Sequence, residues 1–253
     1  MTAFIRQLFS ADNAPLYSAI PFPYIGDAMR FCPIREIREP AASAARPLFA
    51  FDLDGTVTKE ELLPRIAALA GKERETAELT RQTLAGDIPF ADSLRLRVAM
   101  LADIPVEAVR ACVASVPLDP AISAFISARR DDCVIVTGNL DLWVAPLIER
   151  LGCRFFASRG VVRRGRVRVL SILDKAEAAK RLRREGRFLV AVGESVSDEP
   201  LFRRAHCGIA YGGVHEPVPG LLALAGHVVR DGGQLCSLLT SLERTKEPLP
   251  CGG

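Results

Sequence analysis

The sequence predicts an α/β fold, in which a parallel β-sheet carries helices on both faces and a helical insertion follows the first strand. Three observations lead to this prediction. Short continuous apolar runs alternate with helical segments, which is typical of buried parallel strands joined by helices. Several of these runs end directly in polar residues. A long segment after the first run, residues 60–130, contains helical patterns without a strand pattern. A chain of 253 residues is long enough for one such core with an insertion.

Residues 1–45 differ from the rest of the chain, because prolines interrupt every periodic run in them. We expect an N-terminal extension there. Its apolar residues would pack on the same chain or on a partner subunit, which leaves a homodimer open. The first core strand is expected at residues 47–51.

The insertion is expected to form a small helical cap over residues 60–130. It contains four helical segments, two of which end in a glycine that can cap the helix, at residues 61–71, 75–86, 90–101 and 105–116. Because no strand pattern interrupts them, this segment should lie outside the sheet. The core is then expected to consist of residues 46–59 and 131–248.

The second half of the core alternates strands and helices. A buried strand at residues 133–139 ends in Thr-Gly-Asn, and another at 188–195 ends in Gly-Glu-Ser. Between them we expect a helix, a strand, a hairpin turning at Arg164 and Gly165, and a second helix, at residues 141–152, 153–158, 160–170 and 174–186. A helix, a strand and a final strand–helix pair should follow, at residues 198–205, 207–211 and 227–242.

Composition excludes several classes of protein. The net charge of +3, from 33 basic and 30 acidic residues, is too balanced to predict a nucleic-acid partner. No apolar run approaches 18 residues, so no membrane span is expected. The seven cysteines are scattered and contain no C-x-x-C pair, which argues against a disulfide framework and a zinc knot. Without a secretory signal pattern at the N-terminus, a reducing cytoplasm is the expected location.

The most informative stretch runs from Phe51 to Thr58, where two aspartates follow the first strand. Side chains two positions apart in a strand point to the same side, so the carboxylates of Asp52 and Asp54 should converge. Two convergent anions are best tolerated where they bind a cation or perform chemistry. Ligands of parallel sheets bind beyond the carboxyl ends of the strands, where Thr137 and Glu194 are also expected.

This set of groups fits metal-assisted phosphoryl transfer. One carboxylate can attack phosphorus and form an aspartyl-phosphate, which divides a difficult displacement into two easier steps. The second carboxylate can protonate the departing alkoxide and then deprotonate the attacking water. Mg²⁺ prefers oxygen ligands and lets an anionic nucleophile approach an anionic phosphate. The sequence therefore predicts a Mg²⁺-assisted phosphoryl-transfer enzyme.

With these motifs, residues 50–235 resemble the haloacid dehalogenase superfamily of phosphatases, and within it the phosphoserine phosphatase type. The resemblance implies a Rossmann-like core with an inserted cap. In the D-x-D-G-T motif, the resemblance implies that Asp52 is the nucleophile and that Asp54 is the general acid and base. The other motifs imply phosphate binding by Thr137, Gly138 and Lys175, and metal binding by Asp52, the backbone carbonyl of Asp54, Glu194 and the supporting Asp198.

The resemblance extends into the cap and implies a zwitterionic substrate such as O-phospho-L-serine. Glu61 stands where these enzymes receive the substrate ammonium group, and Arg97 where they bind its carboxylate. Phe90 would form an apolar wall, and Asn139 would lie beside the phosphate and the substrate. Two ordinary interpretations remain open. Glu61 can be an acid of the first helical turn that the helix dipole favours, and Arg97 can be a solvated arginine on an amphipathic helix.

The fourth motif departs from the family's usual G-D-G-x-N-D, because Glu194, Ser195 and Ser197 replace an aspartate, a glycine and an asparagine. The extra methylene of Glu194 moves a ligand oxygen by about 1.5 Å. Asn139 likewise replaces a glycine of the second motif. Three alternatives therefore remain: a phosphotransferase, a phosphatase for another small metabolite, and a non-catalytic scaffold that binds a phosphorylated ligand or a partner.

Overall fold

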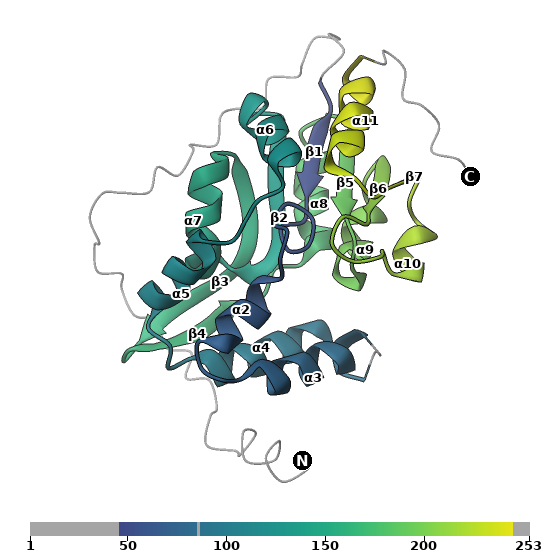
Figure 1. Cartoon of the computed structure of the whole chain (residues 1–253). Helices are drawn as coiled ribbons and strands as arrows, with labels where there is room; N and C mark the ends of the chain where they lie inside the picture. The colour runs from purple at the N-terminus through teal and green to yellow at the C-terminus, as the bar shows by residue number, and fades with distance from the viewer. Residues whose placement is uncertain (1–45, 85–86, 245–253) are drawn as a thin grey trace. The chain divides into compact units, whose positions relative to one another are not determined.

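The structure is a computed structural model that describes residues 46–84 and 87–244. The predicted extension at residues 1–45 and the last residues of the predicted core, 245–248, lie outside the described residues. Within them, seven strands form one sheet with the order β4-β3-β2-β1-β5-β6-β7 (Figure 1). The strands are β1 (Leu48–Phe51), β2 (Cys133–Leu140), β3 (Arg154–Arg163), β4 (Arg166–Ser171), β5 (Leu189–Gly193), β6 (Cys207–Tyr211) and β7 (His227–Val229).

Helices connect the strands, and five of them lie between β1 and β2. The insertion contains α2 (Leu62–Ala68), α3 (Glu73–Leu84), α4 (Phe90–Leu101), α5 (Val106–Ala114) and α6 (Pro120–Ala128). The remaining helices are α7 (Asp141–Leu151), α8 (Lys175–Arg183), the 3₁₀ turn η1 (Val196–Asp198), α9 (Glu199–Phe202), α10 (Pro219–Leu222) and α11 (Gly232–Arg244). Among the described residues, no helix has both the length and the apolar character needed to cross a membrane.

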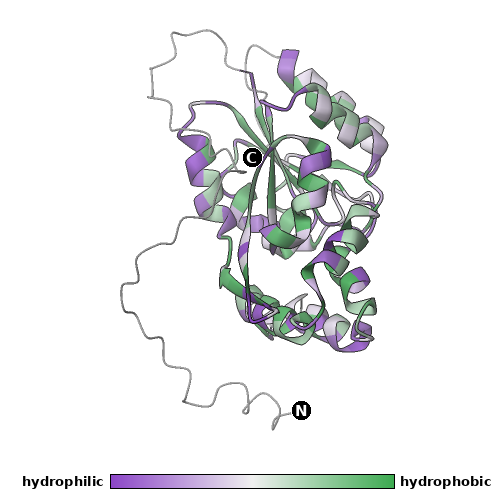
Figure 2. Ribbon diagram, turned by 90° about the vertical axis from the view of Figure 1, so that its left-hand side faces the viewer, coloured by the Kyte–Doolittle hydropathy of each residue, from purple (hydrophilic) through white to green (hydrophobic). Residues whose placement is uncertain are grey.

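The sheet is buried on both faces, which explains why its strands are continuous apolar runs. Phe49 and Phe51 of β1 belong to a hydrophobic cluster with residues of α6, α7 and α11. Leu48 and Ala50 point the other way, into a cluster with residues of α8 and α9. Figure 2 shows hydrophobic residues along the strands and hydrophilic ones on the outer turns of several helices. The predicted α/β fold with a mostly parallel sheet is confirmed.

Strand β3 differs from the prediction of a strand followed by a separate hairpin. It is a single strand of 10 residues that pairs in parallel with β2 and, farther along, antiparallel with β4. Arg164 and Gly165 form the turn, with φ values of 51° and 75°. A two-residue hairpin turn that matches the right-handed twist of its strands requires positive φ at both residues. Sequence alone cannot show that a strand continues when its partner changes, because the partner is chosen by tertiary contacts.

The helices of the insertion pack on different neighbours. Helices α3 and α4 pack against each other, α2 packs against α3 and α5, and α4 also contacts β4. Helix α5 contacts α7, and α6 contacts α11, so these two helices adjoin helices that cover the sheet. Helices α2, α3 and α4 lie beyond the carboxyl end of β1 (Figure 1). The insertion therefore approaches the edge of the sheet where ligands of parallel sheets bind.

Candidate active site

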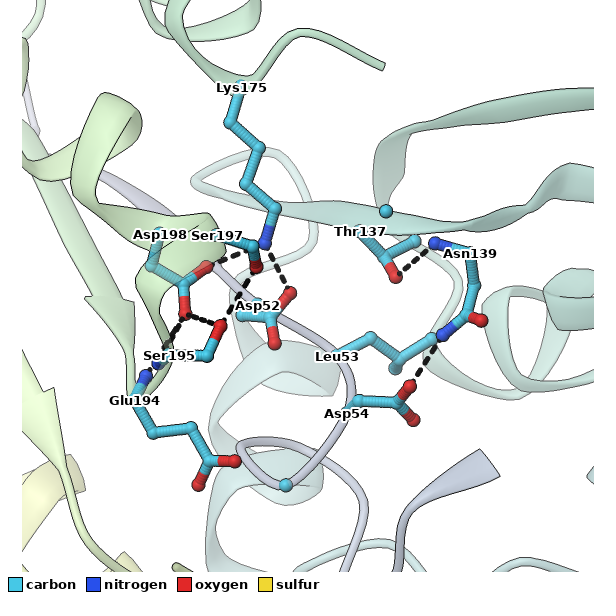
Figure 3. A network of polar contacts seen from close by, with 12 residues as sticks. Asp52, Leu53, Asp54, Thr137, Asn139, Lys175, Glu194, Ser195, Ser197 and Asp198 are labelled. Atoms are coloured by element: carbon cyan, nitrogen blue, oxygen red, sulfur yellow. Dashed lines mark hydrogen bonds and ion pairs between the residues drawn. The ribbon is translucent and has the colours of Figure 1, made fainter. Parts of the chain in front are cut away.

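The strand order brings together polar residues that are far apart in the sequence. Strand β1 pairs with β2 on one side and β5 on the other, and Phe51 lies opposite both Ile135 and Val192. The residues that follow these positions therefore share one edge of the sheet. Figure 3 shows Asp52, Thr137 and Glu194 around this point.

A tight turn after β1 positions Asp54. Gly55 has a φ of +68°, and its N–H bonds to the hydroxyl of Thr58, which donates to the carbonyl of Leu53 at 3.1 Å. The Oδ1 of Asp54 accepts a hydrogen bond from the N–H of Leu62 at 3.1 Å, at the start of α2. The turn thus holds Asp54 between the sheet and the insertion. We did not predict the role of Thr58, although its hydroxyl four residues after Asp54 suits a turn.

Lys175 links two acids from different motifs. It is the first residue of α8, whose N-terminus is capped by the side chain of Asp174. Its buried Nζ lies 2.6 Å from Oδ1 of Asp52 and 2.6 Å from Oδ1 of Asp198. Burial acts to lower the pKa of Lys175, but the negative charges of Asp198 and Asp52 outweigh it and raise this pKa. Among the described residues, no group donates a hydrogen bond to Oδ2 of Asp52.

Asp198 organises the loop after β5. Its Oδ2 accepts hydrogen bonds from the N–H groups of Glu194 and Ser195 and from the Ser195 hydroxyl, at 3.1, 2.9 and 3.1 Å. The Ser195 hydroxyl also lies 2.8 Å from that of Ser197. Both oxygens of Asp198 therefore have protein partners, which gives it a supporting position. The two serines replace the family's glycine and asparagine, and their roles in this loop were not predicted.

The carboxylate of Glu194 is buried, with the backbone of His215 as a hydrogen-bond partner for one of its two oxygens. The residue is only 5% exposed, and its Oε2 has no hydrogen-bond partner among the described residues. The side chain points away from Lys175 (Figure 3) and lies over Gly55, where an added Cβ would overlap Oε1. Burial raises the pKa of Glu194 to about 9, and the charges of Glu61, Asp52 and Asp198 add to this shift. In the described part of the chain, no Lys, Arg or His nitrogen forms an ion pair with this carboxylate within 4.0 Å.

The predicted phosphate-binding segment ends β2. The hydroxyl of Thr137 accepts a hydrogen bond from the N–H of Asn139 at 3.2 Å. Gly138 leaves space for the ring of Phe90, since an added Cβ would lie 2.6 Å from its Cζ. The side-chain amide of Asn139 donates to Oδ2 of Asp54 at 2.6 Å. Asn139 thus binds Asp54, the predicted general acid, and the ring of Phe90 lies against Gly138, the predicted phosphate-binding glycine.

Buried negative charge dominates this site. Burial raises the pKa of Asp52 to about 7; Asp198 adds to the shift and Lys175 opposes it. Burial and the charge of Glu61 raise the pKa of Asp54 to about 7, against the hydrogen bond from Asn139. An excess of buried oxygen donors and the unpartnered oxygen of Glu194 fit a divalent cation.

The predicted cap residues approach the same site. Arg97 is 6% exposed, and its guanidinium donates to Ser93 and Thr80 at 3.3 Å each. Burial lowers the pKa of Arg97, while the charges of Asp54 and Glu61 oppose the shift. No carboxylate of the described residues lies within 4.0 Å of this guanidinium. Glu61, just before α2, instead lies 3.4 Å from Nε2 of His215. We did not predict a role for His215, because the histidines show no metal-ligand spacing in the sequence.

Comparisons with known proteins agree with this geometry. A profile of the haloacid dehalogenase-like hydrolase family matches residues 49–203. The phosphoserine phosphatase of Methanocaldococcus jannaschii is 31% identical over 180 residues, which are 66% of this chain and 85% of the relative. That of Halobacterium salinarum is 32% identical over 200 residues, covering 72% and 92%. A solved phospho-aspartyl intermediate analogue of phosphoserine phosphatase has a TM-score of 0.66 and 27% identity, covering 76% and 98%.

These matches confirm the family predicted from the motifs. The profile covers more than half of the chain and includes the segments around Asp52, Thr137, Lys175 and Glu194. A structure of a substrate-bound phosphoserine phosphatase complex also superposes, with a TM-score of 0.67 and 26% identity over 78% of this chain and 99% of the other. The alternative of a non-catalytic scaffold is therefore set aside. The chain belongs to the haloacid dehalogenase-like hydrolase family and is an enzyme similar to its phosphoserine phosphatases.

Proposed function

We propose that this enzyme is a Mg²⁺-dependent phosphatase that hydrolyses O-phospho-L-serine through an aspartyl-phosphate on Asp52. One observation carries this proposal: Lys175 binds Oδ1 of Asp52 and leaves Oδ2 without a hydrogen bond from the described residues. An oriented carboxylate with one free oxygen at the edge of a parallel sheet is suited to nucleophilic attack.

In the first step, Oδ2 of Asp52 attacks phosphorus and the bond between phosphorus and the ester oxygen breaks. The carboxyl group of Asp54 gives its proton to this departing oxygen, so serine leaves as a neutral alcohol. A pKa raised to about 7 keeps a fraction of Asp54 protonated near neutral pH. The hydroxyl of Thr137, the N–H of Gly138 and the ammonium of Lys175 would bind the phosphoryl oxygens.

In the second step, water attacks the phosphorus of the aspartyl-phosphate. Asp54, now a carboxylate, takes a proton from this water, and the bond between phosphorus and the Asp52 oxygen breaks. Inorganic phosphate leaves, and both acids return to their starting states. The hydrogen bond from Asn139 to Asp54 would hold this carboxyl group in position throughout the cycle.

Phosphatases of this family typically use a divalent metal, and we propose Mg²⁺. Asp52, the backbone carbonyl of Asp54 and Glu194 would hold it, with Asp198 supporting the Glu194 loop. When bound, the cation neutralises negative charge and allows the anionic Asp52 to approach an anionic phosphate.

The proposed cap over residues 60–130 supplies groups that suit an amino-acid substrate. Arg97 is a buried cation without a carboxylate partner among the described residues, and a substrate carboxylate would satisfy it. Glu61 lies at the start of α2 and would receive the substrate ammonium group. These two groups support a zwitterion, and they argue against a simple alkyl phosphate as the preferred substrate.

A substrate panel tests the proposal. We expect Mg²⁺-dependent phosphate release to be fastest from O-phospho-L-serine, with about a tenfold or larger loss of kcat/KM for phosphoethanolamine, which lacks the carboxylate, and for 3-phosphooxypropanoate, which lacks the ammonium group. Equal values for the three esters would contradict the roles of Arg97 and Glu61. Transfer of the phosphoryl group to added glycerol would favour the phosphotransferase alternative. The cytoplasmic location remains part of the proposal.

A further inference from the structure

Both oxygens of the Asp54 carboxylate accept a hydrogen bond, and the two donors come from different parts of the chain. The N–H of Leu62, at the start of α2, donates to Oδ1 at 3.1 Å. The side-chain amide of Asn139, near the end of β2, donates to Oδ2 at 2.6 Å (Figure 3). Asp54 is therefore held between the first helix of the insertion and a strand of the core. The bond from Leu62 uses the backbone, so only the bond from Asn139 depends on the type of side chain.

An irregularity in β2 accompanies the position of Asn139. Thr137 and Leu140 pair with consecutive residues of β3, so β2 has two extra residues between these pairs, and Asn139 is one of them. Irregularities of this kind re-aim side chains and are frequent beside active sites. The regular alternation of β2 is interrupted here, and the side chain of Asn139 reaches the turn that follows β1.

The backbone around Asn139 is fixed by further hydrogen bonds. Its N–H donates to the hydroxyl of Thr137 at 3.2 Å. The preceding carbonyl, of Gly138, accepts a hydrogen bond from the hydroxyl of Ser158 at 2.7 Å, and this hydroxyl also accepts the N–H of Leu173 at 3.0 Å. Ser158 is fully buried, and Asn139 is only 5% exposed. A buried side chain on a fixed backbone keeps one orientation, so the amide of Asn139 is preorganised toward its acceptor.

The need to satisfy a buried acid does not by itself explain this bond. A buried carboxylate requires hydrogen-bond donors, and Asn139 supplies one to Asp54. The second motif of the family, however, usually has a glycine at position 139, which has no side chain to donate. The fold of the family therefore does not require this donor. The additional bond acts on the carboxyl group that is proposed to transfer the proton.

The importance of that proton depends on the leaving group. As Asp52 attacks phosphorus, the bond between phosphorus and the ester oxygen breaks, and the proton of the Asp54 carboxyl group moves to the departing oxygen. The departing oxygen of an alkyl ester is strongly basic and needs this proton. A nitrophenolate is a weak base and leaves without it. A group that orients Asp54 should therefore affect alkyl esters strongly and activated aryl esters little.

We infer that Asn139 is a positioning residue that determines which leaving groups the enzyme accepts. By orienting Asp54 toward the ester oxygen, it enables cleavage of phosphomonoesters of weakly acidic alcohols, the class to which serine belongs. This inference rests on the proposed function, because it requires Asp54 to be the proton donor. It adds that the preference for alkyl over aryl esters depends on a side chain that the family's usual glycine lacks.

A series of phenyl phosphates that differ in the acidity of the phenol, together with O-phospho-L-serine, tests the inference. The value of kcat/KM contains only the steps up to release of the alcohol, so hydrolysis of the aspartyl-phosphate does not affect it. For Asn139→Ala and Asn139→Gly we expect kcat/KM to fall by about 100-fold for O-phospho-L-serine and by less than about threefold for 4-nitrophenyl phosphate. A plot of log kcat/KM against leaving-group basicity should therefore be steeper for both variants than for the wild type.

Ser158→Ala is the matched control, because it removes a hydrogen bond from the same backbone segment without removing a donor to Asp54. We expect it to lower kcat/KM by the same factor for every ester. An equal loss for all esters in the Asn139 variants would overturn the inference, since a merely structural role has that effect. A plot that is as steep for Ser158→Ala as for the Asn139 variants would also overturn it.

Asp54→Asn separates this inference from the proposed function. If Asp54→Asn makes the plot steeper but the Asn139 variants do not, Asp54 stands as the proton donor and the inference is wrong. If the plot is already steep for the wild type and Asp54→Asn leaves its slope unchanged, Asp54 is not the proton donor. In that case the proposed mechanism and the inference fail together.

Discussion

The ammonium group of Lys175 lies 2.6 Å from Oδ1 of Asp52, and the two side chains are only 4% and 8% exposed. The same ammonium group binds Asp198 at 2.6 Å, so one cation is shared by two carboxylates. This arrangement orients Asp52 and leaves its second oxygen without a hydrogen bond from the described residues. It also makes the site depend on Lys175 for its charge balance, because an unpaired buried carboxylate is costly.

Asp52→Asn removes the proposed nucleophile while keeping the shape of the side chain. We expect phosphate release from an aryl phosphate with Mg²⁺ to fall by about 10⁴-fold or more. Lys175 retains Asp198 as a partner, so the circular dichroism spectrum should match that of the wild type. Activity within tenfold of the wild type would rule out the aspartyl-phosphate mechanism.

Lys175→Met should impair both activity and stability, because it leaves Asp52 and Asp198 buried without their shared cation. Urea unfolding should show a loss of about 3–5 kcal/mol in the free energy of unfolding. Lys180→Met on the same helix is a matched control, since the Lys180 side chain is 56% exposed and forms a surface ion pair with Glu177. Similar losses of unfolding free energy in the two variants would contradict a stabilising role for the ion pairs of Lys175 with Asp52 and Asp198.

Stability without metal should decrease as pH rises from 5 to 8. Asp52 and Asp54 have pKa values raised from 3.8 to about 7, and Glu194 from 4.5 to about 9. A carboxyl group whose pKa is higher in the folded than in the unfolded protein stabilises the fold fully at pH values below its unfolded-state pKa. This stabilisation is lost as pH rises through the folded-state pKa, by at most about 1.4 kcal/mol per group and pH unit.

Mg²⁺ should reverse this loss, because it binds carboxylates in their ionised form. Thermal unfolding should therefore show a larger increase in Tm on adding Mg²⁺ at pH 8 than at pH 5. Glu194→Gln, which cannot ionise, should reduce the increase at pH 8. An increase of the same size at both pH values would contradict the assignment of these acids to a cation site.

Arg97→Ala should reduce recognition of the substrate carboxylate. We expect kcat/KM for O-phospho-L-serine to fall by about 100-fold, which corresponds to about 2.7 kcal/mol. Hydrolysis of an aryl phosphate, which has no carboxylate to bind, should change much less. Arg95→Ala is the matched control on α4, because the Arg95 side chain is 58% exposed and pairs with Asp92. If Arg95→Ala lowered kcat/KM as much as Arg97→Ala, the pocket role of Arg97 would be wrong.

Much of the fold could be predicted because its determinants are local. The runs that became β1 and β5 contain no charged or polar side chain, and the run that became β2 begins with four apolar residues, which predicts strands buried on both faces. The continuation of β3 past its contact with β2 and the short helix α10 were not expected. A strand that changes partner and a one-turn helix depend on their neighbours more than on their own periodicity.

The sequence by itself determined which chemical groups lie at the ends of the strands, because alternation along a strand and the turn at Gly55 are local properties. Only the tertiary structure decided how these groups pair. It joins Lys175 to both Asp52 and Asp198, turns Asn139 toward Asp54, and directs Glu194 toward Glu61 and His215. These partners lie on different elements of the chain, and the choice among them follows from which strands are neighbours and how each loop returns. Sequence spacing therefore contained no sign that His215 lies beside Glu61 and Glu194.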